Sequence, residues 1–246
     1  GKATVDLKQT GLSAYSVASS DSSVATASVL GSKVTISAVK SGSVQVTVST
    51  AATSRFDAGS AVVTVSVPLA AGVTESVSGA TSSGVVNKYK ITTKASATDS
   101  KVVPAVAFVG TTTKSGKFGV PASVTLSDGI SYKVTSIGAK ALKGKKFSSI
   151  TISKNATRIG KEAFAGCKKL KAITISAKVK RIDAGVLKGA GAKTATVKTA
   201  KLSKASIKGL VKGSKLTTIK CSGVNKKVKA KYTSWAKAYK PNIKVK

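Results

Sequence analysis

The sequence predicts a mainly β protein with short helices, in which a β-sandwich is followed by a solenoid with a parallel sheet and a C-terminal helical cap. Three observations lead to this prediction. The N-terminal part alternates apolar and polar residues with a period of two, as half-buried strands do. From residue 136 onward, similar segments recur every 22 or 23 residues. Near the C-terminus, large apolar side chains have helical spacing.

The sandwich is predicted over residues 1–67. Its clearest alternating runs are 33–37, 43–48 and 62–67, rich in Val, Ile and Thr, whose branched side chains pack well on a pleated surface. Strands at intervals of about ten residues, with Gly, Ser and Asp turns between them, indicate a sandwich. Residues 68–84 are small and polar, and we expect a linker there because they bury too little surface to order themselves.

Part of the predicted sandwich resembles a known family. The segments Ser19-Ser-Asp-Ser-Ser-Val-Ala-Thr-Ala-Ser28, Lys33-Val-Thr-Ile36 and Val39-Lys-Ser-Gly-Ser43, with a final Val-x-Val strand, are similar to the bacterial Ig-like group 2 family. The resemblance covers nearly all of residues 1–67. It implies an immunoglobulin-like sandwich that serves as a stalk or spacer in a bacterial surface protein.

The solenoid is predicted over residues 85–246, with an opening rung over 85–135, repeats over 136–225 and a cap over 226–246. Equivalent large apolar residues and equivalent glycines mark the repeats: Leu142, Phe164, Leu187 and Leu210, and Gly144, Gly166, Gly189 and Gly213. Paired apolar residues predict one short parallel strand per unit, near 150–152, 173–175, 195–197 and 219–221. One unit cannot cover its own apolar face, so the units must stack.

The best copy of the repeat, Ile-Gly-x-x-Ala-Phe-x-Gly-Cys-x-x-Leu-x-x-Ile-x-Ile at 159–175, resembles the BspA-type leucine-rich repeat. The resemblance covers about residues 117–225 and implies adherence to host or cell-wall components. The copy at 182–197 departs from the pattern, with Asp183 for Gly and Ala192 for Leu, and is expected to pack less well.

The cap is predicted as an amphipathic helix over 226–240 that ends before Pro241. Val228, Tyr232, Trp235 and Tyr239 form its apolar stripe. We expect Trp235 to close the open end of the solenoid core, and stacking of Trp235 on a ligand is the alternative. Ile243 and Val245 predict a last strand.

The positive charge is concentrated in the second part of the chain. Residues 1–80 carry a net charge of +1, and the remaining 166 residues carry +33. Such a surface attracts anionic polymers in a salt-dependent way, through contacts such as Lys140, Lys143, Lys168 and Lys169, or it only keeps the protein soluble. Arg is rare and no nucleic-acid motif appears, so no specific nucleic-acid partner is expected.

The repeat register predicts a second surface, the outward face of the parallel sheet. This face is nearly neutral and rich in hydroxyl groups, and solenoids commonly bind partners on such faces. The alternative is that Ser and Thr merely keep the sheet soluble. The candidate partner-binding residues are Ser149, Thr151, Ser153, Thr174, Ser176, Thr196, Lys198, Thr218 and Lys220.

No catalytic residue, cofactor or metal site is predicted. The chain has no His, and its eight Asp and Glu residues are scattered, so neither a general base near neutral pH nor a carboxylate pair is visible. Cys167 and Cys221 occupy different points of the repeat and are expected to be inert buried thiols, with a disulfide as the alternative.

These features favour a monomeric, extracellular, non-catalytic protein without a membrane span, cut from a longer secreted precursor. Three functions stay open. The first is an adhesion scaffold that binds a host or cell-wall macromolecule. The second is electrostatic retention on anionic wall polymer. The third is an accessory carbohydrate-binding region of a larger protein.

Overall fold

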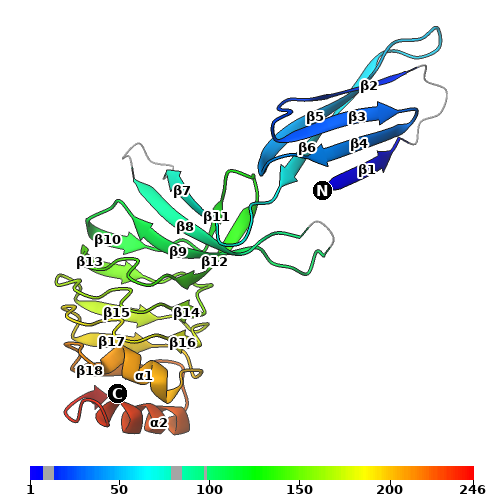
Figure 1. Cartoon of the computed structure of the whole chain (residues 1–246). Coiled ribbons are helices and arrows are strands. Elements are labelled where there is room, and N and C mark those ends of the chain that lie inside the picture. Colours follow the sequence, from blue (N-terminus) through cyan, green and yellow to red (C-terminus); the bar gives the residue numbers. More distant parts are fainter. Residues whose placement is uncertain (8–13, 79–84, 97–98) are drawn as a thin grey trace. The chain divides into compact units, whose positions relative to one another are not determined.

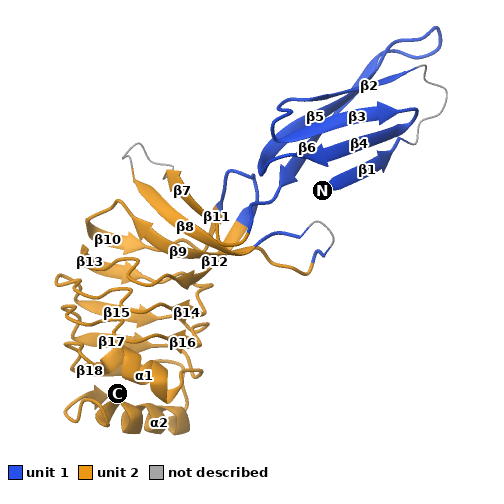
Figure 2. Cartoon of the chain, in the orientation of Figure 1, with its two compact units in different colours: residues 1–70, 94–100, 125–131 blue, residues 71–93, 101–124, 132–246 orange. Residues whose placement is uncertain are grey.

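The computed structural model describes residues 1–7, 14–78, 85–96 and 99–246, which form two compact units (Figure 2). Unit 1 comprises residues 1–70, 94–100 and 125–131, and unit 2 comprises residues 71–93, 101–124 and 132–246. Strands dominate both units, and the described residues contain only two short helices. The predicted class, mainly β with short helices and a parallel sheet, is therefore confirmed.

Unit 1 contains two three-stranded antiparallel sheets that share one apolar core. Its strands are β1 (Lys2–Asp6), β2 (Tyr15–Ser19), β3 (Ala25–Leu30), β4 (Lys33–Ala38), β5 (Gly42–Thr50) and β6 (Gly59–Val67). The sheets have the orders β1-β4-β3 and β2-β5-β6. Ala25, Val34, Ile36, Val44 and Val46 form the core, at alternate positions of β3, β4 and β5. The three alternating runs of the sequence thus lie in β4, β5 and β6.

A distant segment, residues 125–131, also belongs to unit 1. In it, Asp128 is fully buried, and its carboxylate accepts hydrogen bonds from the backbone N–H groups of Leu69 and Ile130, both at 3.0 Å. These bonds compensate the burial of a charged group and tie the chain after β6 to this segment. The prediction of a sandwich over 1–67 omits the segment, because a contact across 59 positions leaves no local pattern.

Unit 2 is a solenoid of stacked rungs with two sheets along its length (Figure 1). Its strands before the repeats are β7 (Thr74–Ser78), β8 (Val86–Thr93), β9 (Ala105–Thr111), β10 (Ser115–Gly119), β11 (Ser123–Thr125) and β12 (Ser131–Ile137). The later strands are β13 (Lys146–Thr151), β14 (Arg158–Ile159), β15 (Ala172–Ile175), β16 (Arg181–Ile182), β17 (Thr194–Val197), β18 (Thr218–Cys221) and β19 (Lys244–Val245).

The first sheet has the order β10-β13-β15-β17-β18-β19, and all its neighbours are parallel. The four strands predicted from the repeats are β13, β15, β17 and β18, which confirms the repeat register. The second sheet, β16-β14-β12-β9-β8-β7, was not predicted. Its repeat strands β14 and β16 are two residues long, too short to show alternation in the sequence.

The core of unit 2 follows the repeat. Leu142, Phe164, Leu187 and Leu210 are all buried, with at most 1% of their surface exposed. The four equivalent glycines Gly144, Gly166, Gly189 and Gly213 all have positive φ, between 66° and 74°. Glycine recurs there because each turn must pass through a left-handed conformation that other residues adopt only at a cost.

Aromatic rings fill the start of the solenoid. Tyr89, Phe108, Phe118 and Phe147 form a continuous series, with successive ring centroids 5.8, 5.7 and 4.9 Å apart. Three of the four rings are fully buried. They come from β8, β9, β10 and β13, so this cluster covers the open N-terminal end of the repeat core.

The linker predicted over residues 68–84 contains a strand. β7 pairs antiparallel with β8 over five residues, so backbone hydrogen bonds order a segment whose side chains are mostly small and polar. Residues 79–84 of the predicted linker lie outside the described residues.

Two helices, α1 (Lys204–Val211) and α2 (Lys226–Lys237), lie at the end of the stack (Figure 1). The predicted cap helix is α2, but Tyr232 rather than Trp235 closes the core. Tyr232 is 1% exposed, and its hydroxyl donates to the Thr199 carbonyl and accepts from the Leu202 N–H, whereas Trp235 is only half-buried. The reason is that α2 turns the 232/236 face inward. Within the described ranges, no helix is long and apolar enough to cross a membrane.

Candidate interaction surfaces of the solenoid

The outward face of the first sheet carries rows of hydroxyl groups in matched register. One row is Ser149, Ala172, Thr194 and Thr218, and the next is Thr151, Thr174, Thr196 and Lys220. Between them runs the inward row Ile150, Ile173, Ala195 and Ile219, at most 3% exposed. The rows arise because parallel rungs place equivalent residues beside one another on one face. The structure thus brings most of the predicted sheet-face residues together.

One predicted member of this face, Ser153, is buried and not on it, and the hydroxyl group of a second, Ser176, is used within the solenoid. Ser153 is 2% exposed, and its hydroxyl donates to the Val134 carbonyl at 3.0 Å. Ser176 is half-buried, and its hydroxyl donates to the Ile152 carbonyl at 3.4 Å. Both residues follow the end of their strands, where the chain turns and strict alternation no longer applies. Their hydroxyl groups satisfy backbone carbonyls between rungs rather than face a partner.

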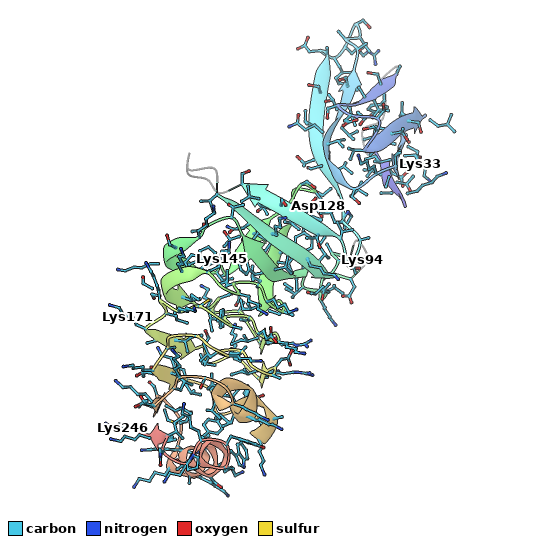
Figure 3. The ribbon with its side chains drawn as sticks, turned by 60° about the vertical axis from the view of Figure 1, so that its left-hand side comes forward. Lys33, Lys94, Asp128, Lys145, Lys171 and Lys246 are labelled. Atoms are coloured by element: carbon cyan, nitrogen blue, oxygen red, sulfur yellow. The ribbon has the colours of Figure 1, made fainter. Side chains whose placement is uncertain are left out.

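Lysines bound the neutral face at both ends. Lys117 on β10 is in register with Ser149, and Lys244 on β19 is in register with Thr218. Lys198 and Lys220 are exposed near the C-terminal end of the face. Other lysines, among them Lys171 and Lys246, project from the solenoid as well (Figure 3). The uncharged positions of the face are therefore Ser149 and Thr151 on β13, Ala172 and Thr174 on β15, and Thr194 and Thr196 on β17.

The four candidate polyanion contacts are exposed, but they are not equivalent. The Lys143 ammonium group lies 2.8 Å from a Glu162 carboxylate oxygen, and this hydrogen bond and charge lower the pKa of Glu162. Lys140 has a positive φ of 57°. Lys168 and Lys169 form no ion pair with any described residue. Lys143 is thus already paired, which reduces its contribution to binding an external anion.

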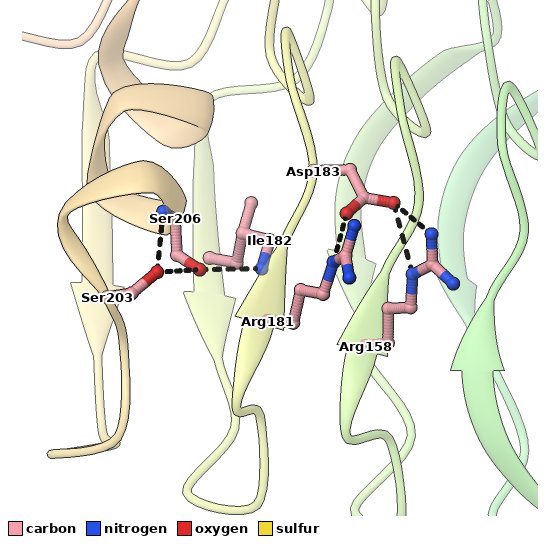
Figure 4. A network of polar contacts seen from close by, with 6 residues as sticks. All are labelled: Arg158, Arg181, Ile182, Asp183, Ser203 and Ser206. Carbon is pink, nitrogen blue, oxygen red and sulfur yellow. Dashed lines mark hydrogen bonds and ion pairs between the residues drawn. The ribbon is translucent and has the colours of Figure 1, made fainter.

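Asp183, at a position where the preceding repeat has Gly160, joins two arginines (Figure 4). One of its carboxylate oxygens accepts from Arg158 Nε and an Arg158 terminal nitrogen, at 3.1 and 2.7 Å, and the other accepts from Arg181 Nε at 2.7 Å. Arg158 and Arg181 are register partners on β14 and β16. We call this arrangement of Asp183 between Arg158 and Arg181 the clamp. The only feature of the sequence that indicates it is the spacing of the two arginines, which equals one repeat.

We expect Asp183→Asn to destabilise the solenoid by about 1 kcal/mol near neutral pH. Burial raises the pKa of Asp183, but the hydrogen bonds and charges of Arg158 and Arg181 outweigh burial and lower it. A pKa that is lower in the folded state than in the unfolded state stabilises the folded protein at pH values above the unfolded-state pKa of about 3.9. This stabilisation is lost as the pH falls through the folded-state pKa. Urea denaturation of both proteins from pH 7 to pH 3 checks this. A stability difference that does not shrink at low pH would contradict the clamp.

Both cysteines are free, but only Cys167 is buried as expected. Cys167 is buried, burial raises its pKa to about 11, and its thiol donates to the Leu142 carbonyl. Cys221 is half-buried, and burial raises its pKa as well. Among the residues that the structure describes, no group of three or more His, Cys, Asp or Glu side chains is placed to hold a metal ion.

Comparison with known proteins places the repeats in a defined class. Residues 130–233 match the BspA type leucine rich repeat region, in six copies. A leucine-rich repeat protein from Bacteroides capillosus is 23% identical, with a TM-score of 0.33, over 46% of this chain and 94% of that chain.

Two further solved structures are similar, each at 17% identity. A leucine rich cell surface protein from Faecalibacterium prausnitzii has a TM-score of 0.35 over 59% of this chain, and the pneumococcal vaccine antigen PcpA has a TM-score of 0.32 over 61%. The chain spans 45% and 41% of their respective lengths. No curated protein matches the chain.

Proposed function

We propose that this chain is a non-catalytic adhesion module of an extracellular bacterial surface protein. In this proposal the sheet face of the solenoid binds a host or cell-wall macromolecule, and unit 1 is an immunoglobulin-like spacer. The BspA-type repeats over residues 130–233 support an interaction role, since solenoids of this kind present extended binding surfaces. The lack of His and the scattered acids support a role without catalysis.

The observation that carries the proposal is the uncharged face of β13, β15 and β17, where five of the six aligned outward residues carry a hydroxyl group. Their central residues Thr151 and Thr174 are exposed, carry no charge and lie in register on one rigid sheet. Hydroxyl groups donate and accept hydrogen bonds, so such a surface can pair with the polar groups of a protein partner. The adjoining lysines at both ends would attract an acidic rim on that partner.

A second candidate function is retention on anionic wall polymer, and the charge distribution favours it. Residues 81–246 carry a net charge of +33, with only four Asp and Glu residues among them. Most lysine charge is therefore left to interact with counterions or with a polyanion. Such binding would be diffuse, because a hydrated ammonium group gives little geometric selection.

One experiment separates the two functions. We expect Thr174→Tyr, which adds bulk without charge at the centre of the face, to lower binding of the full chain to an immobilised extracellular-matrix protein preparation by about tenfold, a loss of about 1.4 kcal/mol. Ala177→Tyr, at an exposed position just after β15, is the matched control and should have no effect. Surface plasmon resonance at fixed ionic strength measures both.

The electrostatic function makes the opposite prediction on purified wall polymer. Neutralising Lys140, Lys143, Lys168 and Lys169 together should weaken that binding and make its salt dependence shallower, whereas Thr151→Ala with Thr174→Ala should leave it unchanged. Because Lys143 is paired with Glu162, it should contribute least of the four. If the threonine pair mattered and the lysine set did not, wall retention by diffuse charge would be wrong.

A further inference from the structure

A groove of about 890 Å³ lies beside α1, on the turn side of the solenoid and apart from the sheet face. Its volume is within the range of about 300–1,000 Å³ that is typical of ligand sites. The turn after β16 and the helix α1 form its sides, and none of the predicted sheet-face residues lines it. The groove is therefore a surface distinct from the one proposed above.

The groove exists because side chains are missing at its floor. Lys140, Glu162 and Gly185 occupy equivalent points of successive turns and share a positive φ, of 57°, 56° and 66°. The first two carry long side chains, whereas Gly185 has none. A Cβ atom at position 185 would meet the side chains of Glu162 and Lys188 at 3.6 and 3.7 Å. Ala184, Gly185 and Ala205 are small and make the lining between the charged side chains largely apolar.

The rim of the groove is strongly basic. Five cations line it: Lys161, Arg181, Lys188, Lys208 and Lys212. The two acids of the lining, Glu162 and Asp183, are already bonded to Lys143, Arg158 and Arg181. No described acid forms an ion pair with Lys161, Lys188 or Lys212. The rim therefore carries more positive charge than its two acids neutralise.

This chemistry selects one class of occupant. No aromatic side chain lines the groove, so it lacks the platform on which sugar rings stack. The one guanidinium group in the lining, Arg181, donates its Nε–H to Asp183, which leaves only its terminal nitrogens for a phosphate. A small apolar floor between separated ammonium groups instead complements a chain that alternates carboxylates with small apolar side chains.

We propose that this groove binds an acidic peptide segment of a partner protein. The carboxylates of the segment would pair with Lys188 and Lys212 on one side and Lys161 on the other, and its apolar side chains would cover Ala184 and Ala205. This site does not require that the sheet face bind anything.

Fluorescence anisotropy with the full chain tests the proposal. The probe is a short labelled peptide in which Glu alternates with Ala and Leu, and its Gln counterpart is the uncharged comparison. We expect Lys188→Ala with Lys212→Ala to weaken binding by about fivefold to tenfold, since two solvent-exposed charge pairs are lost. Lys168→Ala with Lys169→Ala removes the same charge outside the groove and should change binding less than about twofold. Equal losses in both variants would overturn the proposal in favour of diffuse attraction.

Filling the groove gives a test that leaves its charge intact. Ala205→Leu on α1 should block the probe, whereas Ala230→Leu, an exposed alanine on α2, should not. Thermal denaturation of both variants confirms that each is folded. Three results would refute the site. The probe could bind Ala205→Leu with wild-type affinity, or the Gln peptide could bind as well as the Glu peptide. Inorganic phosphate could also displace the probe as effectively as unlabelled peptide does. Because Thr174→Tyr should leave probe binding unchanged, failure here and failure of the sheet-face proposal are distinguishable.

Discussion

Phe164→Ala is expected to destabilise the solenoid by about 3–5 kcal/mol, the usual cost of truncating a buried aromatic residue. Phe164 has no exposed surface and lies in the middle of the row that also contains Leu142 and Leu187. The turns on either side cannot collapse into the cavity, because backbone hydrogen bonds such as the one from the Phe164 N–H to the Val186 carbonyl fix the spacing of the rungs.

Urea denaturation followed by tryptophan fluorescence measures this loss. The chain has a single Trp, Trp235 on α2, so its emission reports on unit 2 and not on unit 1. Lys169→Ala, at an exposed position of the same rung, is the control and should change the free energy of unfolding by less than about 0.5 kcal/mol. A loss below about 1 kcal/mol for Phe164→Ala would mean that the rung is not rigid.

Two effects of opposite sign determine how Gly209→Ala changes the free energy of unfolding. Alanine inside a helix is favoured over glycine by about 1 kcal/mol, so helix propensity alone predicts that the variant is more stable. A Cβ atom at position 209 would, however, meet the carbonyl oxygen of Asp183, with the carbonyl carbon at 2.9 Å and the Ile182 oxygen at 3.0 Å. These are backbone atoms of the neighbouring rung and cannot rotate away. We therefore expect a net loss of about 2 kcal/mol.

The same fluorescence assay checks Gly209→Ala. The control is Gly119→Ala, because an added Cβ there meets nothing within 4 Å. Its free energy of unfolding should stay within about 0.5 kcal/mol of the wild type. If Gly209→Ala stabilised the solenoid, helix α1 would have to move away from the turn at Asp183, and packing of the last rung would then be looser than the structure indicates.

The repeat made much of the solenoid predictable. Spacing of 22 or 23 residues located four parallel strands, the row of Phe164 and its equivalents, and the turn glycines, because each rung repeats the same local conformation. The strands β14 and β16 were not predicted, since two residues are too few to show a periodicity. Helix α1, whose N-cap is Ser203, was not among the predicted elements.

The candidate surfaces were predictable only in part. Alternation along a strand placed Thr151 and Thr174 on the outward face, but it placed Ser153 there as well, because the sequence does not show where a strand ends. The groove depends on a side chain that is absent, at Gly185, and on packing of α1 against a turn that precedes it by about twenty residues. Sequence patterns indicate where side chains lie, and they do not show where neighbouring elements leave a groove between them.

The last strand of the first sheet, β19, has a consequence for the behaviour of the protein in concentrated solution. An edge strand offers unpaired backbone groups to which another molecule can add, and this is a common route to aggregation. Here the edge is two residues long, and the exposed side chains of Lys244 and Lys246 flank Val245. Two such edges would bring four ammonium groups together, so mutual repulsion opposes end-to-end growth of solenoids into fibres. Raising the ionic strength screens that repulsion, and the tendency to associate through this edge should rise with salt.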